Sequence, residues 1–186
     1  MTESAGPTDT PRHVRGLSWD EGERLSAEQH ALHPARERIL AWAEDHQGVF
    51  AGLWLDNTAF LDGIGPVRIG VGAVHGAGAV ARQALLPLVR DPDLLAVVEM
   101  AFCERALWEL QDDIVARYLG KAIGPTRVTG VGVDVEANVL TVMLNQADAD
   151  LEARVRAECE PVPVRIELGE FRPLPLELDG MQKDGT

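Results

Sequence analysis

A short pattern occurs twice in this chain, and it constrains the fold more than any other feature of the sequence. Segment 52–59 reads GLWLDNTA and segment 130–137 reads GVGVDVEA. Both follow the order glycine, apolar, any residue, apolar, aspartate, any two residues, alanine. Each copy alternates as a half-buried strand does, and each is followed by a second expected strand, a helix and a third strand. The pattern therefore predicts two related ββαβ units in tandem.

Helical periodicity and alternation place the other elements around these units. A first helix is expected from Ser26, where Gln29 completes a capping box, to about His46. Pro34 either kinks this helix or stands in its first turn, with the helix then starting near His33. The expected strands are 49–56, 67–74, 94–102, 128–135, 139–144 and 162–168, and the further expected helices are 78–90, 103–119 and 149–159. Asn138 falls in the turn of the second unit, where it can accept a positive φ.

These elements predict an α+β fold, because each sheet needs helices over its apolar face. We expect a ferredoxin-like sandwich of antiparallel sheet and helices, built either as one extended sheet or as two small ones. Residues 1–25 are expected to form a disordered arm, and residues 26–119 the first helix, the first unit and a connecting helix. Residues 126–169 would form the second unit, and residues 170–186 an extended or disordered tail.

Charge and composition exclude several classes of protein. The chain has 30 acidic and 17 basic residues and a formal net charge of -13, which opposes binding to nucleic acid. No apolar run approaches the roughly 20 residues that cross a bilayer, so no membrane association is expected. Residues 1–15 lack the apolar stretch of a secretory signal. We therefore predict a cytoplasmic protein whose two cysteines are reduced.

The strongest enzyme-like signal is a run of glycines between an expected strand and helix. Gly70, Gly72, Gly76 and Gly78 could let a pyrophosphate approach backbone N–H groups at a helix N-terminus. Glu99, near the end of the next strand, stands where an acid that binds ribose could lie. However, Gly70 and Gly72 fall inside the alternating strand rather than in a turn after it. The competing interpretation is a strand face without side chains beneath a packed helix or aromatic ring.

The other candidate catalytic and metal-binding residues lack partners. His30 and His33 could share a helix face, but a zinc site needs about four ligands. Cys103 precedes a helix, yet its acidic neighbours disfavour a thiolate. Asp56 and Asp134 recur with the repeated pattern at strand ends, where turn-forming hydrogen bonds explain them. We therefore predict no catalytic residue, no metal site and no cofactor.

Two segments resemble a known family. Phe50–Asp56 (FAGLWLD) and Val131–Val142 (VGVDVEANVLTV) are similar to the pro-regions of bacterial chymotrypsin-like secreted proteases, the α-lytic protease and streptogrisin group. Those pro-regions carry a Gly-x-Trp-apolar-Asp strand and a Gly-Val-Asp hairpin, and the similarity covers about residues 49–168. The resemblance implies a domain that pairs with a protease, assists its folding and inhibits it, with its C-terminal tail in the active-site cleft. Because this sequence contains neither a protease domain nor a secretory signal, we expect a stand-alone relative without catalytic residues.

The sequence thus favours a non-enzymatic protein-interaction module with an unknown protein partner. The expected contact surface combines a sheet face or edge near Trp54 with the apolar tail, where Phe171, Leu174 and Leu176 could add to a sheet edge or enter a groove. Two alternatives remain open. One is a nucleotide-binding or small-molecule-binding enzyme that uses Gly70–Gly78, and the other is a trans-acting protease inhibitor or folding assistant.

Overall fold

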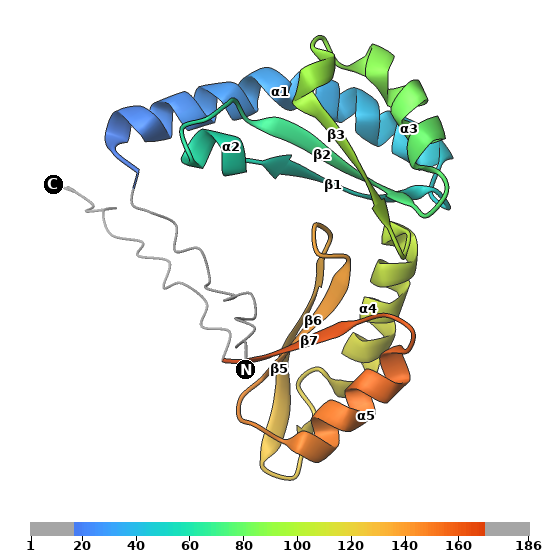
Figure 1. The fold of residues 1–186 in the computed structure, drawn as a ribbon. Coiled ribbons are helices and arrows are strands. Elements are labelled where there is room, and N and C mark those ends of the chain that lie inside the picture. The colour runs from blue at the N-terminus through green and yellow to red at the C-terminus, as the bar shows by residue number, and fades with distance from the viewer. Residues whose placement is uncertain (1–16, 170–186) are drawn as a thin grey trace, which may run out of the picture.

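Residues 17–169 are described by the computed structural model, in which two small mixed β-sheets are packed with helices (Figure 1). In chain order the elements are α1 (Trp19–Asp45), β1 (Phe50–Asp56), α2 (Thr58–Leu61), β2 (Arg68–Val74), α3 (Gly78–Leu85), η1 (Leu86–Leu88), η2 (Pro92–Leu94), β3 (Leu95–Met100), α4 (Glu104–Tyr118), β4 (Ala122–Ile123), β5 (Thr126–Asp134), β6 (Val139–Leu144), α5 (Ala149–Cys159) and β7 (Val164–Leu168). The fold is therefore α+β, as expected, and it contains two small sheets rather than one extended sheet.

Both sheets are mixed, which corrects the expectation of antiparallel sheets. In the first sheet the strand order is β1-β2-β3, with β1 antiparallel and β3 parallel to β2. In the second sheet the order is β4-β5-β6-β7, and β6 and β7 are the parallel pair. The parallel pairs arise because a helix, α3 in one case and α5 in the other, separates the two strands along the chain. Such a crossover returns the chain in the same direction.

Helix α1 begins earlier than the sequence interpretation placed it. Its N-cap is Ser18, whose hydroxyl oxygen accepts the N–H of Glu21 at 3.3 Å, while the Glu21 carboxylate accepts the N–H of Ser18 at 2.8 Å. The predicted cap, Ser26, lies inside the helix. A capping box that ends in a carboxylate also complements the helix dipole, which a glutamine cannot do. Residues 19–25 are thus helical and do not belong to a disordered arm; residues 1–16 and 170–186 lie outside the described residues.

Pro34 lies in the interior of α1, so the helix neither starts at this proline nor ends before it. The proline side chain is exposed, and the buried side of the helix continues past it. The buried residues of α1 recur at intervals of three and four, as a helix packed on a sheet requires. They are Leu32, Ala35, Ile39 and Ala43.

Each sheet has its own apolar core. In the first half, α1 and α3 pack on β2 through residues such as Ile39, Ile69 and Leu85, which are fully buried. In the second half, α4 and α5 pack on β6, with Ile114 and Leu140 among the buried residues. Figure 1 shows α1 and α3 on the side of the first sheet that faces away from the second half. Helix α4 joins the halves.

The turn between β5 and β6 connects the second half to the first. Asn138 has the positive φ that its place in this turn predicted, 56°, and it is buried. Its side-chain oxygen accepts the N–H of Phe102 at 3.0 Å, and its side-chain nitrogen donates to the carbonyl of Phe102 at 2.9 Å. Beside it, Val135 packs against Gly52 of β1 so closely that a Cβ at Gly52 would lie 2.9 Å from the Val135 Cβ. One turn therefore holds both the chain leading into α4 and the edge strand of the first sheet.

Replacing Asn138 by alanine is expected to destabilise the protein by about 3 kcal/mol, because both backbone groups of Phe102 lose a buried partner. Asn138→Gly should lose the same bonds but recover about 1 kcal/mol, since glycine adopts positive φ without strain. Urea unfolding of the three proteins checks both values. Unchanged stability of Asn138→Ala would show that these two bonds do not hold the halves together.

Candidate functional site

The first sheet has one face that its helices do not fill. Ile69 and Val71 of β2 are fully buried against α1, so the alternate residue Gly70 lies on the opposite face. Cross-strand pairing places Trp54 and Ala96 on either side of Gly70, in one row across the sheet. A Cβ at Gly70 would collide with the Trp54 indole, which shows that the indole lies over the glycine. We call the surface formed by Trp54, Gly70, Ala96 and Val98 the Trp54 face.

The Trp54 face is apolar and partly open to solvent. Trp54 and Ala96 are half-buried, and Val98 is 42% exposed. Gly72, the partner of Val98 in the neighbouring strand, is buried, with side-chain atoms of Ala51 and Met100 close to it. The sequence placed the expected contact surface near Trp54, and binding of a partner there stays a prediction. The sequence did not single out Ala96 or Val98, because β3 reads LAVVEM and has no alternation of apolar and polar residues that would distinguish its two faces.

Each of the candidate nucleotide-binding glycines has a structural reason in the fold. Gly70 accommodates Trp54. A Cβ at Gly72 would lie 3.0 Å from side-chain atoms of both Ala51 and Met100, so a larger residue would be crowded there. Gly76 has a φ of 81°, in the turn that leads into α3. The glycine run is therefore explained by packing and turn geometry without a bound ligand.

The N-terminus of α3 already has an anionic partner. The N–H of Gly78 donates to Oε1 of Glu99 at 3.2 Å, and a Cβ at Gly78 would lie 2.8 Å from the Glu99 side chain. Hydrogen bonds from the backbone of Gly76 and then Gly78 lower the pKa of Glu99, and His75 lies 3.7 Å from its other oxygen. The residue that was predicted as a ribose ligand thus lies at the N–H groups where a phosphate would bind.

Three surface grooves among residues 17–169 lie away from the glycine run. Residues of α1 or of the segments next to it line each of them, and no residue of segment 70–78 does so. Ligand sites are usually concave and mostly apolar, with a few converging polar groups. None of these three grooves supplies such a site at Gly70–Gly78.

The two aspartates of the repeated pattern stabilise turns. Asp56 and Asp134 each accept a backbone N–H from the turn that follows, at 3.0 and 2.9 Å. Each also pairs with an arginine at 2.7 Å, Asp56 with Arg68 and Asp134 with Arg165. Burial raises the pKa of both carboxyl groups, but the turn N–H and the arginine together lower it by more. The pKa of each aspartate is therefore below its ordinary value. These contacts agree with the turn-forming role that the sequence predicted.

The remaining candidates do not assemble into a reactive centre. Cys103 is the N-cap of α4 but makes no capping hydrogen bond through its side chain. Cys159 lies in the second core, and burial, followed by the nearby charge of Glu158, raises the pKa of its thiol to about 11. The rings of His30 and His33 are 6.4 Å apart. Within residues 17–169 no three His, Cys, Asp or Glu side chains are grouped to hold a metal ion.

The predicted contact residues of the tail, Phe171, Leu174 and Leu176, lie outside the described residues. Across residues 17–169, no helix combines the length and apolar character needed to cross a membrane. A comparison with models of known protein families finds no match, and a search of curated proteins finds no similar sequence. The resemblance to protease pro-regions therefore rests on the two sequence segments described above and stays a prediction.

Replacing Gly70 by alanine is expected to displace the Trp54 indole and to destabilise the protein by about 1–3 kcal/mol, as overpacking does. Gly132→Ala is the control, because Gly132 is also a strand glycine, in β5 of the second sheet, and no atom lies within 4 Å of its added Cβ. Urea unfolding gives the stabilities, and acrylamide quenching of tryptophan fluorescence reports the exposure of the indole. Equal effects of the two substitutions would mean that Trp54 does not depend on Gly70.

Proposed function

We propose that this protein is a non-enzymatic protein-interaction module and that its partner binds the Trp54 face. The observation that carries the proposal is the half-buried indole of Trp54, held over Gly70 beside the exposed side chain of Val98. Tryptophan is enriched among the residues that dominate binding energy, especially where it is held rigidly within an apolar surface. The net charge of -13 favours a partner with a basic rim around its own apolar patch.

We further propose that the two halves arose by duplication of one ββαβ unit. Several shared features support this. In both units the first two strands, β1 and β2 or β5 and β6, are antiparallel, and the third, β3 or β7, is parallel to the second. In both, the register shifts just before the glycine that opens the repeated pattern, between Phe50 and Gly52 and between Val128 and Gly130. A ferredoxin-like ancestry for the unit remains part of the same proposal.

Substitutions on the Trp54 face test the interaction proposal. Trp54→Ala and Val98→Glu should each reduce recovery of a co-purified partner at least about tenfold, as loss of a central contact does. Trp19→Ala is the matched control, because Trp19 is 80% exposed on α1 and far from this surface in sequence. Deleting residues 170–186 should leave the fold intact and remove the contribution of the predicted tail.

Quantitative mass spectrometry of material purified from the native host gives the recoveries, and circular dichroism shows whether each variant is folded. Val98→Glu is the decisive variant, because the Val98 side chain is exposed and its replacement leaves Trp54 over Gly70. If a partner is recovered equally with wild type, Trp54→Ala and Val98→Glu, it does not bind this face. If recovery is unaffected by the deletion, the tail takes no part.

A second candidate function is inhibition of, or folding assistance to, a chymotrypsin-like protease. Its support is the resemblance of segments 50–56 and 131–142, together with two small ββαβ sheets in the positions of those segments. The nucleotide-binding alternative has less support, because Glu99 and Trp54 occupy the space around the glycines.

The inhibitor candidate predicts that a large molar excess of this protein slows peptide hydrolysis by a bacterial chymotrypsin-like protease. Hydrolysis of a chromogenic peptide, followed with the intact protein and with a heat-unfolded sample, measures the effect. Undiminished protease activity across a range of such enzymes would remove this candidate and leave the interaction proposal untouched.

A further inference from the structure

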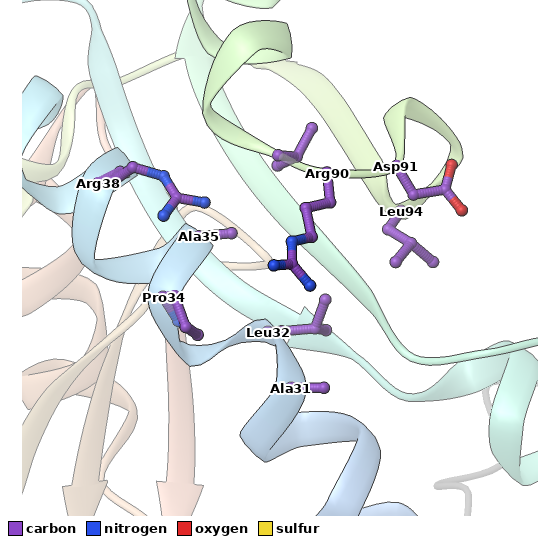
Figure 2. Close-up of a pocket in the computed structure, with 9 residues that line it drawn as sticks. Ala31, Leu32, Pro34, Ala35, Arg38, Arg90, Asp91 and Leu94 are labelled. Atoms are coloured by element: carbon purple, nitrogen blue, oxygen red, sulfur yellow. The ribbon is translucent and has the colours of Figure 1, made fainter.

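A groove of about 370 Å³ lies between α1 and the chain that follows η1 (Figure 2). Its apolar lining includes Leu32 and Ala35 from α1 and Leu94 from η2, three residues that also belong to or pack against the first core. The volume is at the lower end of the range of small-molecule sites in proteins. The groove is formed by α1 and the crossover segment, and it is separate from the residues of the Trp54 face.

Two arginines line this groove. Nε and Nη2 of Arg38 donate to the carbonyl of Leu88 at 3.0 and 2.7 Å, which fixes the guanidinium at the rim and leaves Nη1 to bind another group. Arg90 comes from the segment after η1, and Figure 2 shows its guanidinium projecting over the apolar lining. Among residues 17–169, Arg90 has no hydrogen bond or ion pair to another side chain. A guanidinium offers five N–H donors in a geometry that matches a carboxylate.

The neighbouring carboxylate does not neutralise this pair. Oδ1 of Asp91 accepts the N–H of Asp93 at 3.0 Å, and Figure 2 shows the carboxylate of Asp91 directed away from the guanidinium of Arg90. The groove thus presents two positive charges above an apolar surface, in a protein with a net charge of -13. This combination fits a ligand with one negative group and a short apolar body.

We propose that the groove binds a small carboxylate with a compact branched carbon chain. The carboxylate accepts hydrogen bonds from Arg90 and from the free Nη1 of Arg38, and the chain packs on Leu32, Ala35 and Leu94. A bidentate guanidinium–carboxylate contact is among the stronger polar interactions in proteins. The proposal does not rest on the interaction function, because none of its residues lies on the Trp54 face.

Titration of the full chain with 4-methylpentanoate, followed by ¹H–¹⁵N chemical shifts, tests the proposal. A ligand of this size in a shallow groove should bind with Kd on the order of 1 mM. The shifts should centre on the amides of Leu32, Ala35 and Leu94. The isosteric neutral amide and the corresponding primary amine should bind at least about tenfold more weakly, because neither supplies a negative charge to the arginines.

Two variants, with Arg82→Ala as a control, separate the contribution of charge from that of the apolar groove. Arg90→Ala should weaken binding about tenfold or more, whereas Arg82→Ala, which removes an exposed arginine of α3 with the same change in net charge, should leave it unchanged. Ala31→Leu keeps both arginines and a good helix former, but its longer side chain extends into the groove and should abolish binding.

The results decide the proposal in either direction. Binding that is lost in Arg90→Ala and Ala31→Leu and kept in Arg82→Ala supports it. Equal affinity for the acid and the neutral amide, equal affinity of wild type and Arg90→Ala, or no shifts at 20 times the expected Kd would overturn it. Comparison of 4-methylpentanoate with N-acetylleucine distinguishes a free acid from the C-terminal carboxylate of a peptide as the source of the ligand.

Discussion

Packing of helices on one face of the first sheet determines which residues lie on its opposite face. Helices α1 and α3 bury Ile69, Val71 and Ala73, so the alternate residues of β2, Gly70 and Gly72, face away from them. A three-stranded sheet gains independent stability from one packed face, and its second face remains available. With glycines at its centre, that face has room for one large ring from a neighbouring strand, and Trp54 fills it. The same packing thus produces both the stability of the half and its apolar surface.

The turn at Asn138 connects the second half of the protein to this first sheet. Its amide pairs with both polar groups of the Phe102 backbone, as a neighbouring strand would, and Val135 beside it contacts Gly52 of β1. Gly52 also stands at the register shift of β1, so the turn contacts β1 at the point where its pairing with β2 changes. Strand β1 therefore carries both Trp54 and the contact with the turn of the second half.

Much of the fold could be predicted from the sequence, because strand alternation and helical periodicity are local properties. The strands that contain Gly70 and Gly130 and the order of the main elements in each half agree with that prediction, whereas the short elements α2 and β4 were not expected. What could not be predicted depends on contacts distant in sequence. The pairing of Trp54 with Gly70 follows from a register set by the shift between Phe50 and Gly52. The parallel pairs follow from crossover geometry. The start of α1 is the exception, because it is decided between two local capping boxes.

The same distinction between local and distant contacts explains which candidate sites the sequence could reveal. The glycine run suggested phosphate binding because sequence alone shows neighbours along the chain and not across the sheet. Glu99, Trp54 and Met100 approach these glycines from other strands and occupy the space that a ligand would need. Conversely, Arg38 and Arg90 carry no motif and are brought to one groove only because α1 packs beside the crossover segment. In this fold, packing occupies the residues that most resemble a binding site in the sequence, whereas Arg90, which pairs with no other side chain among residues 17–169, belongs to no motif.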